Sequence, residues 1–212
     1  MAINGFQIKD IIYKITDVIE ENKMYLTELD ATIGDGDHGL NMSKGFQTVK
    51  EKIKDDECKN IGDMLKKVSM ALISNVGGAS GPLYGTAFLK ASSVVMNKAE
   101  IEVKDFAKML EEAINGIKAR GKATIGEKTM VDTIEPALNG LKEAIENNLT
   151  PLECLEKMHD AALRGKDSTK EMIATKGRAS YLGERSKGHL DAGAVSSYLI
   201  LKTIYEEIAK SR

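Results

Sequence analysis

Apolar residues recur at every third or fourth position along most of this 212-residue chain, and this spacing constrains the fold more than any other feature. Such spacing places side chains on one face of an α-helix, so each stretch predicts an amphipathic helix. Only three prolines occur, aromatic residues make up 5% of the chain, and no stretch alternates apolar and polar residues convincingly. The clearest stripes are Ile8, Ile11, Ile12, Ile15 and Ile19; Ile61, Met64, Leu65, Val68 and Leu72; Phe106, Met109, Leu110, Ala113, Ile114 and Ile117; and Ala194, Tyr198, Leu201, Tyr205 and Ile208.

The pattern predicts about eight helices joined by short connections. Thr150-Pro151-Leu152-Glu153 predicts a helix start with an N-cap, a proline in the first turn and a capping-box glutamate, and Asp132-Thr133-Ile134-Glu135 predicts a second capping box. Short connections favour antiparallel neighbours in a bundle or ring, and no Ser/Gly/Pro-rich linker divides the chain. We therefore expect one all-α domain over residues 1–212. The expected helices span residues 4–29, 38–54, 60–75, 82–97, 104–120, 132–147, 151–169 and 191–210.

Charge and composition exclude several classes of protein. With 30 basic and 32 acidic residues the net charge is −2, so no overall basic field exists to hold nucleic acid or an anionic membrane. The first residues lack the charged and apolar regions of a signal peptide, and no apolar run approaches the roughly 18 residues of a membrane span. Cys58 and Cys154 offer neither a disulfide framework nor a zinc spacing. We expect a cytoplasmic protein.

An acidic, glycine-hinged turn, Asp30-Ala-Thr-Ile-Gly-Asp-Gly-Asp-His-Gly-Leu-Asn41, carries the strongest chemical signal. Asp30, Asp35 and Asp37 repel one another, so clustering them costs stability unless a cation is present. Gly34 and Gly36 allow the backbone to bend and direct the carboxylates to one point. Hard oxygen ligands with positions left open suit Mg²⁺ that also coordinates substrate phosphates. The alternative is a set of solvated turn residues and helix caps.

Two familiar motifs match this turn only superficially. Gly34 to Gly39 has the form G-x-G-x-x-G, but a dinucleotide fingerprint follows a strand, and here a helical pattern precedes it. An EF-hand frame that starts at Asp35 would put Phe46 where the bidentate glutamate belongs. We therefore favour an open Mg²⁺ site between two helices.

Three other glycine-rich loops add candidate phosphate and nucleotide contacts. Gly77-Gly78-Ala79-Ser80-Gly81-Pro82 precedes a helix, where backbone N–H groups and the helix dipole favour a phosphate, although a tight interhelical turn has the same composition. Residues 176–191 hold the densest positive charge of the chain, including Arg178, whose planar guanidinium suits phosphate. The third loop spans residues 121–130, and its Met130 could pack on an adenine face or belong to the core. No Walker sequence occurs.

These motifs together resemble the L subunits of bacterial dihydroxyacetone kinase, and the resemblance spans nearly the whole chain. The matching stretches are Leu29-Asp30, Gly34-Asp-Gly-Asp-His-Gly39, Asn41-Met42, Gly77-Gly-Ala-Ser-Gly-Pro-Leu-Tyr-Gly-Thr86, Gly126-Glu-Lys-Thr-Met-Val-Asp132, Gly177-Arg-Ala-Ser-Tyr-Leu-Gly183 and Gly188-His-Leu-Asp-Ala-Gly-Ala194. The family implies a closed barrel of eight antiparallel amphipathic helices with ADP and two Mg²⁺ ions at one rim. One departure is Ala192, where many relatives have proline.

The resemblance also implies roles for individual residues. Asp30, Asp35 and Asp37 would hold the Mg²⁺ pair and, with Arg178, form the catalytic set. The residues expected to bind ADP or ATP are His38, Gly39, Leu40, Asn41, Gly78, Ala79, Ser80, Gly121, Thr129, Met130, Arg178, Asp191, Ala192 and Gly193.

The resemblance implies a division of labour between subunits. A separate K subunit would present dihydroxyacetone, and in the phosphoenolpyruvate-dependent version an M subunit of the phosphotransferase system would rephosphorylate ADP that stays bound to the L subunit. In the ATP-dependent version the L and K domains are usually fused, so a chain of 212 residues favours the first version. Two alternatives stay open: an L-like subunit of an ATP-dependent or fatty-acid-type kinase, and a non-catalytic nucleotide-binding regulator.

Overall fold

The computed structural model describes residues 2–211, and within them almost all regular structure is helical. This confirms the all-α prediction. A two-stranded sheet and two short 3₁₀ helices complete the described structure. In chain order the elements are β1 (Ala2–Asn4), α1 (Gly5–Glu21), α2 (Lys23–Ile33), α3 (His38–Ile53), α4 (Ile61–Asn75), α5 (Ser80–Val94), β2 (Glu100–Glu102), α6 (Val103–Gly121), α7 (Val131–Glu146), α8 (Pro151–Ser168), η1 (Thr169–Glu171), η2 (Arg178–Ser186) and α9 (Ala192–Lys210).

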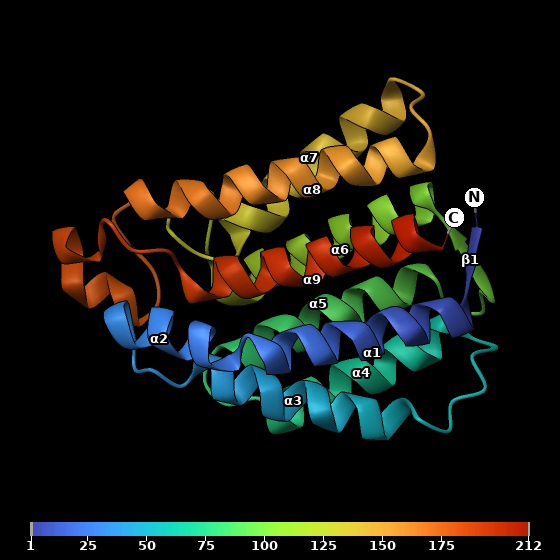
Figure 1. Ribbon diagram of the computed structural model, residues 1–212, viewed down its shortest axis with the longest axis horizontal. Coiled ribbons are helices and arrows are strands. Elements are labelled where there is room, and N and C mark those ends of the chain that lie inside the picture. Colours follow the sequence, from blue (N-terminus) through green and yellow to red (C-terminus); the bar gives the residue numbers. More distant parts are fainter. Residues whose placement is uncertain (1, 212) are drawn as a thin grey trace.

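The long helices pack side by side in a ring. α1 contacts α3, the contacts continue in order from α3 to α9, and α9 contacts α1 again. Figure 1 shows these helices running back and forth along the long axis, with the amino and carboxyl ends at one end of the molecule. The predicted stripe of α1 is buried in this ring, as are those of α4 and most of α6. Apolar side chains enclose a central cavity of about 170 Å³.

The first expected helix is in fact two helices. α1 ends at Glu21, and Asn22 has φ −98° and ψ 6°, outside the helical region. Its side chain donates to the carbonyl of Val18 at 2.8 Å and so caps the end of α1. The apolar pattern continues across this break, which is why the sequence shows one stripe. α2 then extends to Ile33, contacts α3, α9 and η2, and carries Asp30 to one end of the ring (Figure 1).

A short antiparallel sheet was not expected from the sequence. β1 and β2 pair with Ile3 opposite Ile101, and both strands are only three residues long. Three residues are too few to show an alternating pattern, so the sequence carries no strand signal here. The sheet lies at the end of the ring opposite α2 and η2, beside the chain termini (Figure 1).

The two predicted capping boxes have different outcomes. Thr150 and Glu153 form the expected box at the start of α8. Asp132, by contrast, lies inside α7, which begins one residue earlier at Val131. Its carboxylate accepts hydrogen bonds from the backbone N–H groups of Gly126 at 2.5 Å and Thr129 at 2.7 Å, so it organises the loop before the helix.

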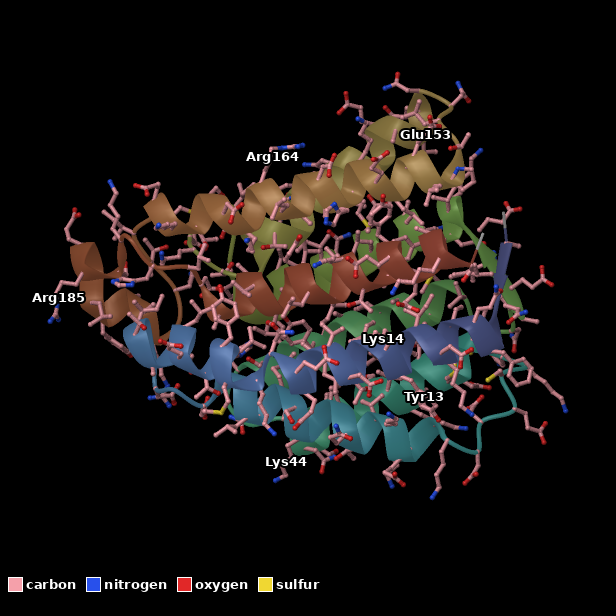
Figure 2. The ribbon with its side chains drawn as sticks, viewed as in Figure 1. Tyr13, Lys14, Lys44, Glu153, Arg164 and Arg185 are labelled. Carbon is pink, nitrogen blue, oxygen red and sulfur yellow. The ribbon has the colours of Figure 1, made fainter. Side chains whose placement is uncertain are left out.

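Charged side chains cover the outside of the ring. In Figure 2 the labelled Lys44, Arg164 and Arg185 all project away from the helices. Among residues 2–211, no helix is both long and apolar enough to cross a membrane.

Candidate functional site

Four helices begin around one cavity at the end of the ring marked by α2 and η2 in Figure 1. The first turns of α3, α5, α7 and α9 all contribute to the wall of this cavity, whose volume is about 280 Å³. The N-terminus of a helix carries partial positive charge and backbone N–H groups without intrahelical partners. Four such ends around one cavity favour an anionic ligand.

The acidic turn forms the polar edge of this cavity. One carboxylate oxygen from each of Asp30, Asp35 and Asp37 lies within 4.8 Å of the others. Asp30 also accepts hydrogen bonds through Oδ2 from the backbone N–H groups of Asp37 (2.9 Å) and His38 (3.1 Å). These two hydrogen bonds stabilise the conformation of the turn. A Cβ at Gly34 would lie 2.2 Å from Oδ1 of Asp30, so only glycine fits there. The donor set suits a divalent cation.

Arg178 connects the basic loop, which we define as residues 176–191, to the acidic turn. It begins η2, and its Nε lies 2.9 Å from Oδ2 of Asp35. The preceding residue, Gly177, has φ +65°, a backbone conformation that glycine adopts without steric cost. The Arg178 side chain is 68% exposed, so its remaining donors face solvent or a ligand.

A buried polar network ties three of the four helix starts together. The His38 ring contacts Ser80 Oγ through Nδ1 (3.0 Å) and Ser196 Oγ through Nε2 (2.8 Å). The Tyr84 hydroxyl contacts Ser196 Oγ (2.7 Å) and Ser197 Oγ (2.8 Å). Burial lowers the pKa of His38, although the carboxylates of Asp30 and Asp37 oppose this effect. Burial also raises the pKa of Tyr84, so both groups are neutral at pH 7. The network therefore fixes α3, α5 and α9 relative to one another without charge.

Asp191 caps α9 beside the same cavity. Its Oδ2 accepts a hydrogen bond from the Ala194 N–H at 2.7 Å. Desolvation raises its pKa to about 6, against the opposing effects of this hydrogen bond and of the nearby Lys128 ammonium.

The cavity brings together most of the residues that the sequence singled out. Its wall includes Asp30, Asp35, Asp37, His38, Gly78, Ala79, Ser80, Gly121, Thr129, Met130, Arg178, Asp191, Ala192 and Gly193. Three expected residues do not line it. Leu40 is 52% exposed, Gly39 packs against Lys23 and Thr27 of α2, and Asn41 lies against Gly77.

Other residues of the wall carried no clear signal in the sequence. Leu83, Ile117, Ala123 and Val131 form an apolar part of the wall, but in the sequence they read as ordinary core positions. Tyr84 and Ile117 line both this cavity and the central apolar cavity, so they separate the two. Lys128 is 1% exposed and could not be distinguished from a surface lysine without the structure. The one sequence feature that pointed to Lys128 is its position within the stretch Gly126-Glu127-Lys128-Thr129-Met130, which belongs to the family resemblance.

Comparison with known proteins places the chain in one family. Residues 32–206 match the family model described as the DAK2 domain. The chain is 45% identical over 188 residues to the ADP-binding subunit DhaL of PEP-dependent dihydroxyacetone kinase 1 from Listeria innocua, and the match covers 89% of each chain. It is 41% identical over 204 residues to the corresponding DhaL subunit from Escherichia coli, covering 96% of this chain and 97% of that one.

The fold is shared with a longer enzyme. The crystal structure of the dihydroxyacetone kinase of C. freundii in its native form aligns with a TM-score of 0.73 at 23% identity, covering 94% of this chain and 34% of that one. The same enzyme in complex with AMP-PNP and Mg²⁺ aligns with a TM-score of 0.69 at 24% identity, covering 93% and 33%. Given the family match and the identities of 41–45% over almost entire chains, this chain belongs to the DAK2-domain family and to its DhaL subunits.

Proposed function

We propose that this chain is the nucleotide-binding subunit of a phosphoenolpyruvate-dependent dihydroxyacetone phosphotransferase. It carries Mg²⁺ with ADP or ATP as a coenzyme that passes phosphate from an M subunit to dihydroxyacetone on a K subunit. One observation carries the proposal: three carboxylates converge within 4.8 Å at the mouth of a cavity that four helix N-termini surround. Metal ligands beside an anion-binding cavity are what a Mg²⁺–nucleotide complex requires.

Asp30, Asp35 and Asp37 would hold a pair of Mg²⁺ ions. The fit rests on the donor set, because three carboxylates with no sulfur or imidazole ligand suit a hard cation, and their mutual repulsion is relieved by one. Bound Mg²⁺ would neutralise phosphate charge and hold the phosphates in position. Asp30 would be constrained in this role, since its Oδ2 already accepts two backbone N–H groups.

The glycine turn before α5 would bind the phosphates. Ala79, the N-cap of α5, makes no side-chain capping hydrogen bond, so the first N–H groups of the helix remain available to a ligand. Gly78 has φ +64°, and a Cβ added there would meet nothing within 4 Å, so the turn is open on that side. Arg178, which lines the same cavity, would add charge-assisted hydrogen bonds and stabilise the transferred group.

The apolar part of the wall would take the adenosine. Leu83, Ile117 and Ala123 lie in the same wall as Gly121, Thr129 and Met130. Met130 is 5% exposed, and a thioether side chain packs well on an aromatic face. Asp191, Ala192 and Gly193 would close the pocket at the start of α9.

The place of the site supports transfer between subunits. The cavity lies at one end of the helix ring, and its wall includes the exposed residues Asp35, Gly78 and Arg178, so the K and M subunits could approach a bound phosphate in turn. The relatives from L. innocua and E. coli are named as subunits, and this chain covers 89% and 97% of their lengths. Two buried free cysteines agree with a reducing, cytoplasmic location.

The nucleotide content of the purified protein tests this proposal. ADP that survives gel filtration in the presence of Mg²⁺ and does not exchange with added ATP would support a resident coenzyme. Nucleotide that exchanges freely would favour an ATP-dependent kinase subunit. Failure to bind ADP at millimolar Mg²⁺ would contradict the proposed function and favour a different role, such as a regulator.

A further inference from the structure

Lys128 is an unusual residue for the wall of a cavity. It is 1% exposed, and its backbone has φ +60°, in the left-handed region that lysine rarely adopts. Burial of an ammonium group is costly unless specific partners compensate it. Both the burial and the backbone conformation therefore indicate that the surrounding structure holds this side chain in place.

The partners of Lys128 are backbone carbonyls of two other segments. Its ammonium donates hydrogen bonds to the carbonyl oxygens of Thr169, in η1, and His189, two residues before Asp191. Thr169 makes a second connection, because its Oγ1 accepts a hydrogen bond from the Asp191 N–H at 3.2 Å. Lys128 and Thr169 together join the loop before α7 to the segment that enters α9.

These contacts determine how two parts of the cavity wall meet. A Cβ built on Gly193 would lie 3.7 Å from both the backbone nitrogen and the Cβ of Met130, so the first turn of α9 abuts the residue that precedes α7. No ladder of backbone hydrogen bonds can hold two helix starts together. The Thr133 hydroxyl in α7 donates to the Ala194 carbonyl in α9 at 3.1 Å, and the bridge through Lys128 adds a second connection, which holds the segment before α9 to the loop before α7.

The charge of Lys128 also matters at this position. Burial lowers the pKa of Lys128, while the carboxylates of Asp191, Glu171 and Asp132 oppose this effect. Asp132 is 1% exposed and faces the same loop. Without the Lys128 ammonium, the negative charges of Asp191 and Asp132 would lose the nearby cation that offsets them, and these charges would disfavour an anion in the cavity.

We propose that Lys128 is a positioning residue for the nucleotide, which holds the first turn of α9 against Met130 and balances the carboxylates of Asp191 and Asp132 beside it. This inference rests on the proposed nucleotide-binding function. Lys128 contacts backbone oxygens through its ammonium, so its effect on the nucleotide acts through Asp191, Ala192 and Gly193. It should therefore alter nucleotide affinity more than the rate of transfer at saturating nucleotide.

The test compares Lys128→Met with Lys170→Met in the full chain. Lys170 is an exposed neighbour of Thr169, so its variant controls for loss of a lysine in the same region. Binding of ADP in the presence of Mg²⁺ is measured by calorimetry. Lys128→Met leaves two carbonyls without a donor, and we expect ADP affinity to fall by about tenfold or more. The Lys170→Met variant should bind ADP as the wild type does, and Lys128→Arg should recover part of the lost affinity because it restores a cation with several donors.

The outcomes separate this inference from the function on which it rests. Wild-type binding together with unchanged affinity in Lys128→Met would overturn the inference alone, and failure of the wild type to bind ADP would overturn both. A loss of transfer rate at saturating ADP with unchanged affinity would also contradict it. If Lys128→Met does not fold, Thr169→Val provides the second test, since it removes the Oγ1 that accepts from the Asp191 N–H, together with the local hydrogen bond from this hydroxyl to the Lys166 carbonyl. Weaker ADP binding by this variant supports the bridge, and unchanged binding contradicts it.

Discussion

The Arg178 Nε lies 2.9 Å from Oδ2 of Asp35, so the basic loop closes directly on the acidic turn. Both side chains are substantially exposed, at 68% and 34%, and such a pair stabilises the fold only slightly. We therefore expect the pair to matter for ligand binding more than for stability. Asp35 and Arg178 would each change partner when Mg²⁺ and phosphate bind, the carboxylate turning to the cation and the guanidinium to the phosphate.

Replacement of Arg178 by alanine should impair transfer far more than it affects stability. If Arg178 binds the transferred phosphate as proposed, the variant would lose a charge-assisted contact, and we expect the rate to fall by about a hundredfold or more. Arg185→Ala is the matched control, because Arg185 lies on the same 3₁₀ helix and projects outward in Figure 2. Steady-state transfer with the K and M subunits measures the effect. Equal activity of the two variants would show that Arg178 does not act on the phosphate.

Asp30 and Asp37 should differ in their effects although both are expected to bind the cation. Asp37→Asn should abolish Mg²⁺-dependent ADP binding and leave stability nearly unchanged. Asp30→Ala should abolish it too, and should lower the free energy of unfolding by about 1–2 kcal/mol, because two backbone N–H groups lose their acceptor. Urea unfolding and ADP titration, with Glu28→Gln on the same helix as control, measure both quantities. Full ADP binding by Asp37→Asn would show that the metal assignment is wrong.

Asp191 should give the protein a distinct pH dependence. Its pKa is raised to about 6 in the folded state by desolvation, from an unperturbed value of 3.8, so the folded state binds more protons than the unfolded state between these values. Its contribution to stability therefore declines as pH rises from about 4 to 6, by on the order of 2 kcal/mol for this partly buried group. Asn is also a good N-cap, so Asp191→Asn should remove this decline.

The measurement is the difference between wild type and Asp191→Asn in urea unfolding across this pH range. Because both proteins share the other carboxylates, their contributions to the pH dependence drop out of this difference. A constant difference from pH 4 to 7 would show that the pKa of Asp191 is not raised.

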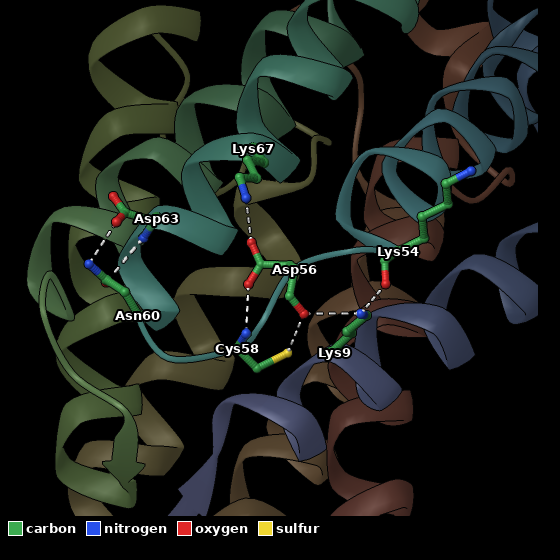
Figure 3. Close-up of polar contacts among 7 residues, drawn as sticks. All are labelled: Lys9, Lys54, Asp56, Cys58, Asn60, Asp63 and Lys67. Carbon is green, nitrogen blue, oxygen red and sulfur yellow. Dashed lines mark hydrogen bonds and ion pairs between the residues drawn. The ribbon is translucent and has the colours of Figure 1, made fainter.

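A substitution at the end of the ring opposite the cavity should lower stability without changing the affinity for nucleotide. Figure 3 shows Asp56 between Lys67 and Cys58, with its carboxylate 2.6 Å from Lys67 Nζ and 2.8 Å from the Cys58 N–H. Burial would raise the pKa of Asp56, but these two partners and the charge of Lys9 outweigh it and lower the pKa. Asp56→Ala should therefore cost about 1–2 kcal/mol of unfolding free energy and leave ADP affinity unchanged.

An exposed ion pair in the same loop provides the control for this prediction. Lys59 and Glu57 have side chains that are 81% and 74% exposed, so Lys59→Ala should change stability by less than about 0.5 kcal/mol. A parallel loss of stability and ADP affinity in Asp56→Ala would show that the two ends of the ring are coupled.

The sequence was sufficient to predict the helices and the acidic turn, because both depend on local patterns. Ile8, Ile11 and Ile15 repeat with the period of a helix, and Asp35 between Gly34 and Gly36 forms a local signal of ligand geometry. The break at Asn22 was missed because apolar residues continue beyond it at Leu26 and Ile33, and because the side chain and backbone N–H of Asn22 end the helix through hydrogen bonds to the Val18 carbonyl. Leu40 was expected at the phosphates; it lies in the first turn of α3 and is 52% exposed, and its contact with a ligand stays a prediction.

The contributions of Lys128, Tyr84 and Asp132 depend on tertiary contacts. Lys128 donates to carbonyls 41 and 61 residues away, and the Tyr84 hydroxyl reaches serines 112 and 113 residues away. No local pattern encodes such pairings. Asp132 fits a capping box by spacing, but its carboxylate faces the preceding loop because Gly126 and Thr129 present their N–H groups there.

We propose that nucleotide bound to this chain accepts and passes on a phosphoryl group without leaving. The most direct measurement follows labelled phosphate from a phosphorylated M subunit to ADP on the purified protein, and then to dihydroxyacetone when the K subunit is added. We predict that the label appears on protein-bound ATP and moves to dihydroxyacetone while the nucleotide remains bound, and that Asp37→Asn shows neither step. Transfer only after release of the nucleotide, or no labelling of bound ADP in the wild type, would contradict the account.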